Sequence, residues 1–422
     1  MTLRMADPKE IILFLSEVAK ELSYPIFICG GYCWKHFLGM IPAGDIDVCV
    51  DHSDLQKVLD YILANFNAKL ITQKSEKTRS IGSFSIIVEI GLVWYTFDFC
   101  SRRSETYDID SRIPKTRPGS VEEDQARRDF TICSILFNPQ DCTYLHFQSS
   151  YEDTKNGTLK TNKDPCASLD EDPFRAFRAI RICSSNGLKL DPQLEKALMD
   201  PRLALSTEKK LSPELINAEL ENIFKHENAS TQRLAVELLI KTPLFSFLFG
   251  KASNISVLSR EPAHPKSTDL DVVCCFWLAI CLFISEQENN AFAVLTKLRW
   301  PKKIIKKVVD LIYATNLLDS LTNIRIGLFF DTTKLDWEFS LELARTKGLE
   351  TSIFWEIAQT QKLVKFWDRP PLLSPKQLAE LGIQSNQIRK VQNDMRLKQM
   401  EWSAETEEEA IKRAVEFVKN NK

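Results

Sequence analysis

Hydrophobic and polar positions divide the chain into a first part with strands and helices and a longer second part of helices. In the first part, residues 8–22 carry apolar side chains at helical spacing and predict an amphipathic helix. Short apolar runs at residues 26–29 and 46–50 predict buried strands. Residues 84–90 and 93–99 predict two further strands, joined as a hairpin by a glycine-containing turn.

Two segments interrupt this pattern. Gly30-Gly31 ends the first apolar run, and residues 32–38 after it predict a helix. Residues 101–126 are polar and contain Pro114 and Pro118-Gly119, so they predict a long mobile loop. A loop of that length inside a compact domain is usually either functional or disordered.

From about residue 165 onward, apolar positions repeat at helical spacing almost throughout. Asn186-Gly187 predicts the end of one helix, and Ser212-Pro213 predicts the start of another. The longest apolar run, Val272 to Ile284, is shorter than the roughly 20 residues that a membrane span needs, so it predicts a buried helix and no membrane contact. The fold class is therefore predicted as α+β, with a small mixed-sheet head followed by helices.

Composition narrows the functional classes. With 44% hydrophobic and 27% charged residues and a net charge of −2, the chain is globular, and any site for a polyanion must be a local patch. Eleven cysteines without a CxxC pair, together with only five histidines, argue against a disulfide framework and against zinc. We expect reduced thiols in a cytoplasmic protein without a signal peptide.

Two aspartates on the second predicted strand are the first candidates for chemistry. Residues two apart on a strand share a face, so Asp45 and Asp47 point to one side while Ile46 and Val48 face the core. Two neighbouring carboxylates repel each other unless a cation lies between them, and oxygen ligands suit Mg²⁺. An exposed polar strand face explains this pair equally well.

A third carboxylate favours the metal site. Asp98 lies on the strand Val93 to Phe99, among aromatic residues, where an isolated carboxylate is costly unless it is paired or binds a metal. Three carboxylates on neighbouring strands predict a two-metal phosphoryl-transfer site. Gly30-Gly31, between a strand and a helix, would let the backbone approach a phosphate closely, although such a pair alone is most often a turn.

Arginines form the other candidate binding groups. Arg127-Arg128 suits a phosphate, with an ion pair to a nearby acidic residue as the alternative. Arg175, Arg178 and Arg181 are spaced by three and form a stripe on one helix face. A bound polyanion would relieve their mutual repulsion, but so would acidic partners supplied from elsewhere in the fold.

The motifs GG, DID, RRDFT and EDPFRAFRAIR occur here in an order and spacing that resemble the class II tRNA nucleotidyltransferase and bacterial poly(A) polymerase family. The segment RRSETYDIDSRIP is similar to the flexible loop of that family, and the C-terminal RPPLLSPKQLAELGI is similar to its tail. The resemblance implies a head at residues 1–150, a neck that recognises the base at 151–225, a helical body at 226–365 and an RNA-binding tail at 366–422.

The resemblance also implies roles for individual residues. It implies that Asp45 and Asp47 hold the catalytic Mg²⁺ and that Asp98 is a third catalytic carboxylate. The residues that it implies for nucleotide binding are Gly30, Gly31, Lys35, Arg128, Asp172, Arg175, Arg178 and Arg181. Among these, Asp172 and Arg175 would read the base of CTP or ATP without a nucleic-acid template, because a carboxylate and a guanidinium together can match the Watson–Crick edge of C or A.

The chain also departs from the family pattern. Where the family has Arg and Asp after the glycine pair, this chain has Trp34 and Lys35. We expect Lys35 to replace the missing charge, as a point charge in place of a guanidinium fork. The predicted function is Mg²⁺-dependent addition of C, A or both to the 3′ end of tRNA, with release of pyrophosphate. A poly(A) polymerase of the same family and a catalytically degenerate RNA-binding protein are the alternatives.

One basic patch lies outside the predicted active site. Lys302, Lys303, Lys306 and Lys307 would share a broad helix face and are candidates for RNA backbone contacts, with a solvated helix face at least as probable. Near-neutral total charge favours one compact RNA shape, such as tRNA, over long unstructured RNA.

Overall fold

The computed structural model describes most of the chain. The described ranges are 8–40, 44–74, 82–108, 110–226, 228–262, 267–319, 322–352, 354–364, 366–402 and 406–420. They form two compact units, Met1–Ser212 and Pro213–Lys422. The predicted helix start at Ser212-Pro213 coincides with this boundary.

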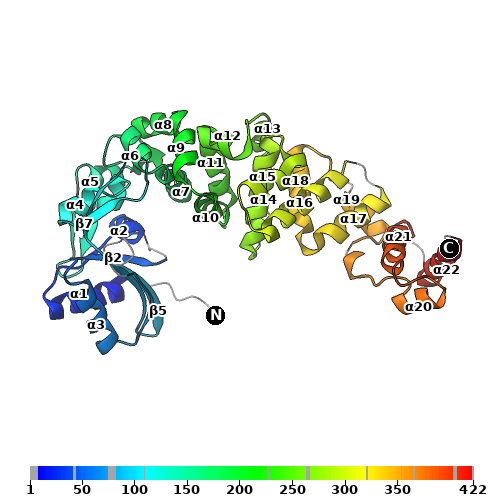
Figure 1. The fold of residues 1–422 in the computed structure, drawn as a ribbon, viewed down its shortest axis with the longest axis horizontal. Coiled ribbons are helices and arrows are strands. Elements are labelled where there is room, and N and C mark those ends of the chain that lie inside the picture. The colour runs from blue at the N-terminus through cyan, green and yellow to red at the C-terminus, as the bar shows by residue number, and fades with distance from the viewer. Residues whose placement is uncertain are drawn as a thin grey trace. The chain divides into compact units, whose positions relative to one another are not determined.

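A mixed sheet forms the head of the first unit (Figure 1). Its strands within the described residues are β1 (Phe27–Ile28), β2 (Ile46–Val50), β3 (Ala68–Lys74), β4 (Ser83–Ile90), β5 (Val93–Ser101), β8 (Leu136–Asn138) and β9 (Thr143–Leu145). Their order in the sheet is β3-β4-β5-β2-β1-β8-β9. The β2–β5 pair is parallel, and the other neighbours in the sheet are antiparallel.

The two faces of this sheet have different characters, as the alternation along β2 predicts. Ile46, Val48 and Val50 point into a hydrophobic core that helices α1 (Pro8–Leu22) and α3 (Leu55–Asn65) close. Both helices lie on the same side of the sheet in Figure 1. The opposite face, which carries Asp47 and Asp98, is left for the candidate site.

The glycine pair belongs to a helix and does not precede it. Helix α2 spans Gly30–Phe37, so the predicted range of 32–38 begins two residues late. Gly30 has a φ of +66°, and a Cβ at this position would lie 2.3 Å from Oδ2 of Asp47. Glycine is therefore required at residue 30, because both the backbone conformation and the approach of Asp47 exclude a side chain.

The prediction of a long mobile loop at residues 101–126 is wrong. Strands β6 (Arg103–Thr106) and β7 (Lys115–Pro118) form an antiparallel pair, and helix α4 (Val121–Ala126) follows. The helix starts at a capping box, in which Ser120 and Glu123 exchange hydrogen bonds. The sequence analysis missed the hairpin because its strands lack apolar alternation. Ion pairs between polar side chains stabilise it instead.

The rest of the first unit is mostly helical. It contains η2 (Thr131–Ser134), α5 (Ser150–Lys155), α6 (Pro165–Glu171), α7 (Phe174–Asn186), α8 (Pro192–Leu198) and α9 (Arg202–Lys210). A short parallel pair, β10 (Thr158–Leu159) with β11 (Lys189–Leu190), joins these helices. Helix α7 ends at Gly187 in a left-handed conformation, as the sequence predicts.

The described part of the second unit is helical. Its longer helices are α10 (Pro213–Phe224), α11 (Ala229–Ile240), α14 (Leu270–Ile284), α16 (Lys302–Leu317), α17 (Asn323–Thr333), α18 (Trp337–Lys347), α21 (Ile388–Glu401) and α22 (Glu407–Asn420). The shorter ones are α12 (Pro243–Phe249), α13 (Ser256–Ser259), η3 (Glu288–Asn290), α15 (Ala291–Lys297), η4 (Lys334–Asp336), α19 (Phe354–Thr360), η5 (Phe366–Asp368) and α20 (Pro375–Glu380). The fold class predicted from the sequence is confirmed.

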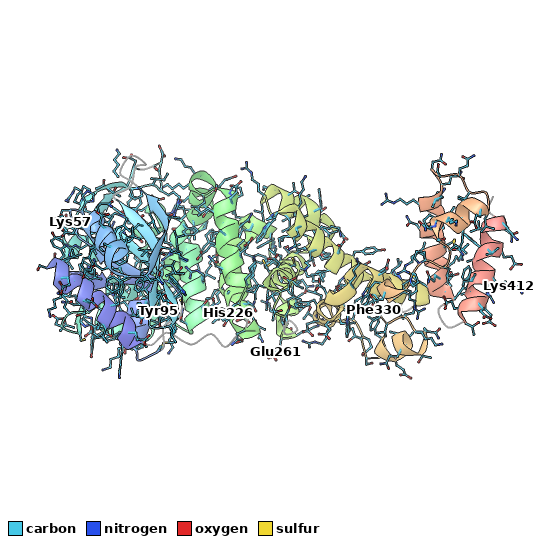
Figure 2. All side chains as sticks on the ribbon, turned by 90° about the horizontal axis from the view of Figure 1, so that it is seen from below. Lys57, Tyr95, His226, Glu261, Phe330 and Lys412 are labelled. Atoms are coloured by element: carbon cyan, nitrogen blue, oxygen red, sulfur yellow. The ribbon has the colours of Figure 1, made fainter. Side chains whose placement is uncertain are left out.

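Buried apolar residues organise this second unit. Val272 to Ile284 is buried along its whole length within α14, as predicted. Farther along the chain, Phe330 (labelled in Figure 2) is fully buried against Phe329, Phe354 and neighbouring aromatic side chains. Of the helices in the described ranges, none combines the length and apolar character needed to cross a membrane.

Candidate functional site

A cavity of about 620 Å³ lies in the first unit, on the face of the sheet away from α1 and α3. The predicted residues that line it are Gly30, Gly31, Lys35, Asp47, Arg128, Asp172, Arg175, Arg178 and Arg181. They come from α2, β2, the segment after α4, the junction of α6 and α7, and α7 itself. The fold thus gathers residues that lie up to 151 positions apart in the chain around one space.

The three predicted carboxylates are placed differently. Asp47 on β2 and Asp98 on β5 are direct partners across parallel strands, and Asp47 lines the cavity. Asp98 accepts a hydrogen bond from the Ser85 hydroxyl and is not part of the cavity wall. Asp45 is exposed just before β2 and does not line the cavity either. Asp47 is therefore the carboxylate best placed for chemistry.

The environment of Asp47 favours its protonated form in the absence of a cation. Burial, and after it Cys29 and Asp98, raise the pKa of Asp47 to about 7 against the opposing effect of Arg128. A carboxylate perturbed in this way is typical of a functional site. A divalent cation at this carboxylate would compensate the cost of ionising it.

Asp47 and Asp98 fit a magnesium ion that takes its other ligands from substrate. Within the described ranges, no three His, Cys, Asp or Glu side chains are grouped so that they could hold a metal ion. Mg²⁺ in nucleotide sites is commonly bound by one or two carboxylates together with phosphate oxygens and water. The donor chemistry of Asp47, with Asp98 beside it, matches that arrangement.

A buried carboxylate orients the Arg127-Arg128 pair. Asp124 on α4 is fully buried, and its oxygens accept hydrogen bonds from Arg128 Nη2 at 2.7 Å and from Arg127 Nη2 at 2.7 Å. Burial raises the pKa of Asp124, but the two guanidinium groups outweigh it and hold the pKa below its usual value. The ion pair with a nearby acidic residue, which the sequence analysis gave as the alternative to a phosphate site, is therefore present. Both arginines also line the cavity.

A second buried carboxylate supports the arginine stripe on α7. Asp129 accepts a 2.6 Å hydrogen bond from Nε of Arg178, while Arg175 pairs with Glu171. Acidic partners supplied by the fold therefore reduce the repulsion that the spacing of Arg175, Arg178 and Arg181 implies. All three arginines still line the cavity.

The predicted base-reading carboxylate is engaged by a residue that the sequence analysis did not single out. Arg112, from the turn between β6 and β7, donates to both oxygens of Asp172, at 3.0 and 3.3 Å. The same guanidinium lies over the ring of Phe174, and the Phe174 N–H donates to Asp172. Arg112 thus presents two parallel N–H donors to the carboxylate of Asp172. The edge of a planar nucleobase could present donors to Asp172 in the same way.

A chain of hydrogen bonds joins Arg175 to the arginine pair. Arg175 Nη2 donates to the hydroxyl of Tyr107, which donates to Glu105. Glu105 in turn accepts a hydrogen bond from Arg127 Nη1 at 3.1 Å. The β6–β7 hairpin therefore connects the two groups of cavity arginines, and no sequence spacing revealed this, because the partners lie up to 68 residues apart.

Lys35 lies in the cavity wall near Arg181. Burial lowers the pKa of Lys35, and the positive charge of Arg181 lowers it further. The indole of the preceding residue, Trp34, is buried, and the Lys35 ammonium lies 5.7 Å from its centroid. Two cations close enough to affect each other suit an anionic ligand between them.

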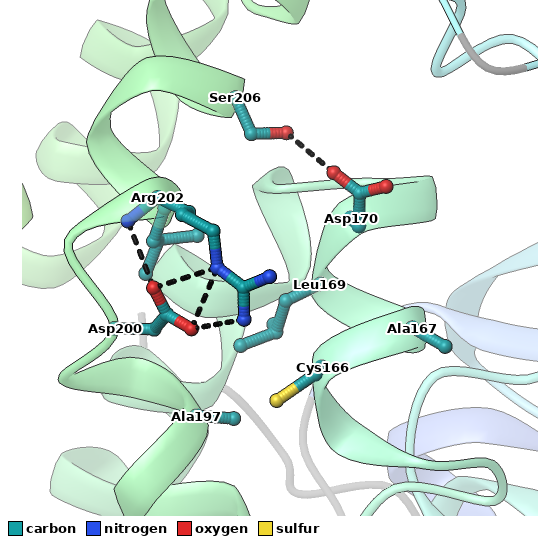
Figure 3. A pocket seen from close by; sticks show the side chains of 9 residues that line it. Cys166, Ala167, Leu169, Asp170, Ala197, Asp200, Arg202 and Ser206 are labelled. Carbon is teal, nitrogen blue, oxygen red and sulfur yellow. Dashed lines mark hydrogen bonds and ion pairs between the residues drawn. The ribbon is translucent and has the colours of Figure 1, made fainter.

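A second cavity of about 310 Å³ lies between α6, α8 and α9 (Figure 3). Arg202 pairs with Asp200 at its edge, and Ser206 donates to Asp170. None of the site residues predicted from the sequence lines this cavity. Its residues serve below as matched controls.

The lysine patch on α16 is largely engaged by acidic side chains. Lys303 pairs with Asp271, Lys306 with Asp310, and Lys307 with both Asp269 and Asp336. Lys302 is exposed. These partners reduce the net positive charge of this face, so an RNA contact here stays a prediction.

Known proteins resemble this chain in sequence over its first part and in fold over nearly its whole length. Residues 26–160 match the family described as the poly A polymerase head domain. A tRNA nucleotidyltransferase of Schizosaccharomyces pombe (cca2) is 29% identical over 252 residues, which cover 56% of this chain and 50% of the yeast protein. The chain thus spans half the length of this curated relative, and less than half of the next three.

Solved structures share the fold along nearly the whole chain. The CCA-adding enzyme of Bacillus stearothermophilus in complex with CTP superposes with a TM-score of 0.70 at 18% identity, covering 99% of both chains. The Thermotoga maritima CCA-adding enzyme complexed with tRNA gives a TM-score of 0.62 at 18% identity, covering 99% of this chain and 97% of that one.

The first unit has a mixed-sheet head, and the cavity on this sheet is lined by the Asp47 carboxylate and by arginines. Helices follow the head along the chain. The chain is similar to the class II tRNA nucleotidyltransferase and bacterial poly(A) polymerase family: residues 26–160 match its head domain, and solved CCA-adding enzymes share the fold along nearly the whole chain.

Proposed function

We propose that this protein is a template-independent nucleotidyltransferase that adds C, A or both from CTP and ATP to the 3′ end of tRNA. The observation that carries the proposal is the joint placement of Asp47, Arg128, Asp172 and Arg175 around one cavity. The relatives and solved structures that match the chain, whose names and titles include CCA-adding enzymes, CTP and tRNA, support it.

The chemistry of the proposed reaction divides among these residues. Asp47, with Asp45 and Asp98 as further candidates, would hold Mg²⁺, which when bound lowers the pKa of the attacking hydroxyl and stabilises the leaving pyrophosphate. Arg128, fixed by Asp124, would bind the triphosphate as a fork of N–H donors. Gly30 and Gly31 at the start of α2 would let phosphate approach the backbone.

Asp172 and Arg175 would select the base. Arg175 is buried and held by Ser168 and Tyr107, so its orientation is fixed before a nucleotide binds. Asp172 offers acceptors beside it, and a base that reaches these acceptors must replace Arg112. Base selection then depends on how well the incoming edge reproduces the donors of Arg112.

The finer divisions of the chain belong to the same proposal. A head at residues 1–150, a neck at 151–225, a body at 226–365 and a tail at 366–422 would place the tRNA along the helical parts, with Lys302, Lys303, Lys306 and Lys307 as candidate contacts. A cytoplasmic location is supported by the eleven cysteines, all of which are free thiols.

The proposal is tested with tRNA that lacks its 3′ CCA, Mg²⁺ and one labelled nucleotide at a time. We expect incorporation of C, A or both, to at most three residues, and none without the divalent cation. Long A tails on unstructured RNA would instead identify a poly(A) polymerase, the second candidate, which the match to the poly A polymerase head domain favours. RNA binding with no incorporation of any nucleotide would show a catalytically degenerate protein.

The raised pKa of Asp47 predicts a pH dependence of metal binding. Because only the ionised carboxylate binds a cation, we expect the affinity for Mg²⁺ to increase as the pH rises from about 6 to about 8, around the Asp47 pKa of about 7. Titration of the metal-free protein with Mg²⁺ at several pH values measures this change. An Asp47→Asn variant should lose both the affinity and its pH dependence, and a flat profile in the wild type would contradict the assignment.

The raised pKa of Asp47 also makes the stability of the fold depend on pH. A carboxyl whose pKa is higher in the folded than in the unfolded protein favours folding when it is protonated. Without metal, the contribution of Asp47 to the free energy of unfolding should therefore fall as the pH rises from about 4, near the unfolded pKa, to about 7. Saturating Mg²⁺ should offset this loss.

A further inference from the structure

Three cysteines lie together behind the carboxylates of the candidate site. Cys49 on β2 and Cys100 on β5 are direct partners across the two parallel strands, two residues beyond the Asp47–Asp98 pair. Cys29 precedes α2, and its N–H donates to the carbonyl oxygen of Asp47 at 2.9 Å. Cys29 and Cys49 pack with Phe27 and Leu136, and Cys100 borders this cluster.

The thiols of this cluster influence one another. Cys100 and Cys49 lower the pKa of the Cys29 thiol, and Cys29 raises the pKa of both of them. The Cys100 sulfur also lies 3.6 Å from the carbonyl oxygen of Val48, which places it against β2. Nothing in the proposed transfer reaction uses these thiols.

Exposure differs within the cluster. Cys100 is half-buried and lines the cavity, and Cys29 lines it at 2% exposure. Cys49 is fully buried beside them. A small solute that enters the cavity therefore reaches Cys100 first and finds Cys49 directly next to it.

The strand register decides which pair can be bridged. Residues directly opposite each other on neighbouring strands are about 5 Å apart at Cα, within the range of about 4.4–6.8 Å that a disulfide spans. Cys49 and Cys100 meet this condition. Cys29 and Cys100 lie on either side of β2, about 10 Å apart by the same spacing, so their bridging would require the backbone to move.

We propose that Cys100 and Cys49 form an oxidation site for small peroxides, and that the resulting disulfide reversibly inactivates the adjoining nucleotide site. The effect on activity rests on the function proposed above, whereas formation of the disulfide does not.

The reaction balances with hydrogen peroxide as the oxidant. The Cys100 sulfur attacks one peroxide oxygen, the O–O bond breaks, and the thiol proton leaves with the other oxygen as water. The Cys49 sulfur then attacks the sulfenic acid sulfur of Cys100, the S–O bond breaks, and a second water leaves with the Cys49 proton. Two thiols are oxidised and one peroxide is reduced to two waters.

The disulfide would change the site through its neighbours. It locks the side chains of Cys49 and Cys100 to each other two residues from Asp47 and Asp98, and it removes two thiols from the surroundings of Cys29, the residue before Gly30. A displacement of about 1 Å at reacting groups costs on the order of 100-fold in rate. A dithiol would restore the original positions by reducing the bond.

The test treats the full-length protein with hydrogen peroxide and then blocks the remaining thiols. Mass spectrometry of non-reduced peptides is expected to show Cys49 linked to Cys100. Incorporation of labelled nucleotide into tRNA should fall by about 10-fold or more and return after dithiothreitol. A Cys100→Ala variant should form no such link and keep its own untreated activity under peroxide.

Controls separate the proposal from general oxidation and from misfolding. Cys166→Ala removes an exposed thiol of the second cavity and should behave as wild type. Thermal unfolding verifies each variant, and Cys49→Ala replaces Cys100→Ala if the latter fails to fold. A wild type without the Cys49–Cys100 link, a link involving Cys29 instead, or equal inactivation of the Cys100→Ala variant would overturn the proposal. If the untreated protein incorporates no nucleotide, the proposed function fails, and the peptide link alone decides the oxidation site.

Discussion

Replacing Asp47 with asparagine is expected to reduce nucleotide incorporation by about 1,000-fold. The substitution keeps the shape of the side chain and its fit against Gly30 but removes the negative charge that would bind a divalent cation. Steady-state incorporation of labelled CTP and ATP into tRNA lacking its 3′ end measures the effect.

The same substitution should leave the fold intact or stabilise it. The folded protein raises the pKa of Asp47 by burial, so a neutral amide at this position avoids the cost of an ionised carboxylate at neutral pH. Asp60→Asn, on the exposed side of α3, is the matched control and should retain full activity. Turnover of Asp47→Asn near the wild-type rate would refute the metal assignment.

Replacing Asp172 with asparagine is expected to relax the choice of nucleotide. The amide presents a donor where the carboxylate presents only acceptors, so the base edge that Asp172 favours loses its advantage. We expect the ratio of kcat/KM between the preferred nucleotide and GTP or UTP to fall by about 10- to 100-fold. Single-nucleotide incorporation with each of the four triphosphates gives this ratio.

A nearby aspartate provides the control for this change. Asp170 lies two residues earlier, is exposed and contacts Ser206 at the second cavity (Figure 3). Asp170→Asn should leave both rate and selectivity unchanged. If Asp172→Asn lowered the rate for all four nucleotides equally, Asp172 would position the hairpin through Arg112 and would not read the base.

The hairpin between β6 and β7 links the candidate phosphate-binding and base-reading ends of the cavity. Through Glu105 and Tyr107 it connects Arg127, beside the phosphate-binding candidate Arg128, to Arg175. Burial raises the pKa of Tyr107 and the charge of Glu105 raises it further, so the hydroxyl stays protonated and remains a donor to Glu105. One continuous chain of hydrogen bonds therefore joins the two ends of the cavity.

Local patterns predicted the elements whose faces differ in polarity. The alternation along Ile46–Val50 predicted both the strand and the side on which Asp47 lies, because the period of a strand is fixed by its geometry. The buried helix α14 followed in the same way from its unbroken apolar run. Helix α3 was missed, although Leu55, Val58 and Ile62 carry the apolar spacing that could have revealed it.

The contacts within the site could not be derived from spacing. That Asp98 faces Asp47 depends on a parallel pairing of strands separated by about 50 residues, and sequence alone does not set which strands pair. The positions of Asp45 outside the cavity and of Arg112 inside it likewise depend on how the chain returns to itself.

The sequence by itself determined the α+β class, the family resemblance and nine of the residues that line the cavity, because these depend on periodicity and on motifs that are continuous in the chain. Only the tertiary structure decided which distant side chains meet: Arg112 with Asp172, Arg178 with Asp129, and Cys49 with Cys100. Such pairs form between segments that are distant in the chain, and their energies depend on burial and distance, which folding alone sets.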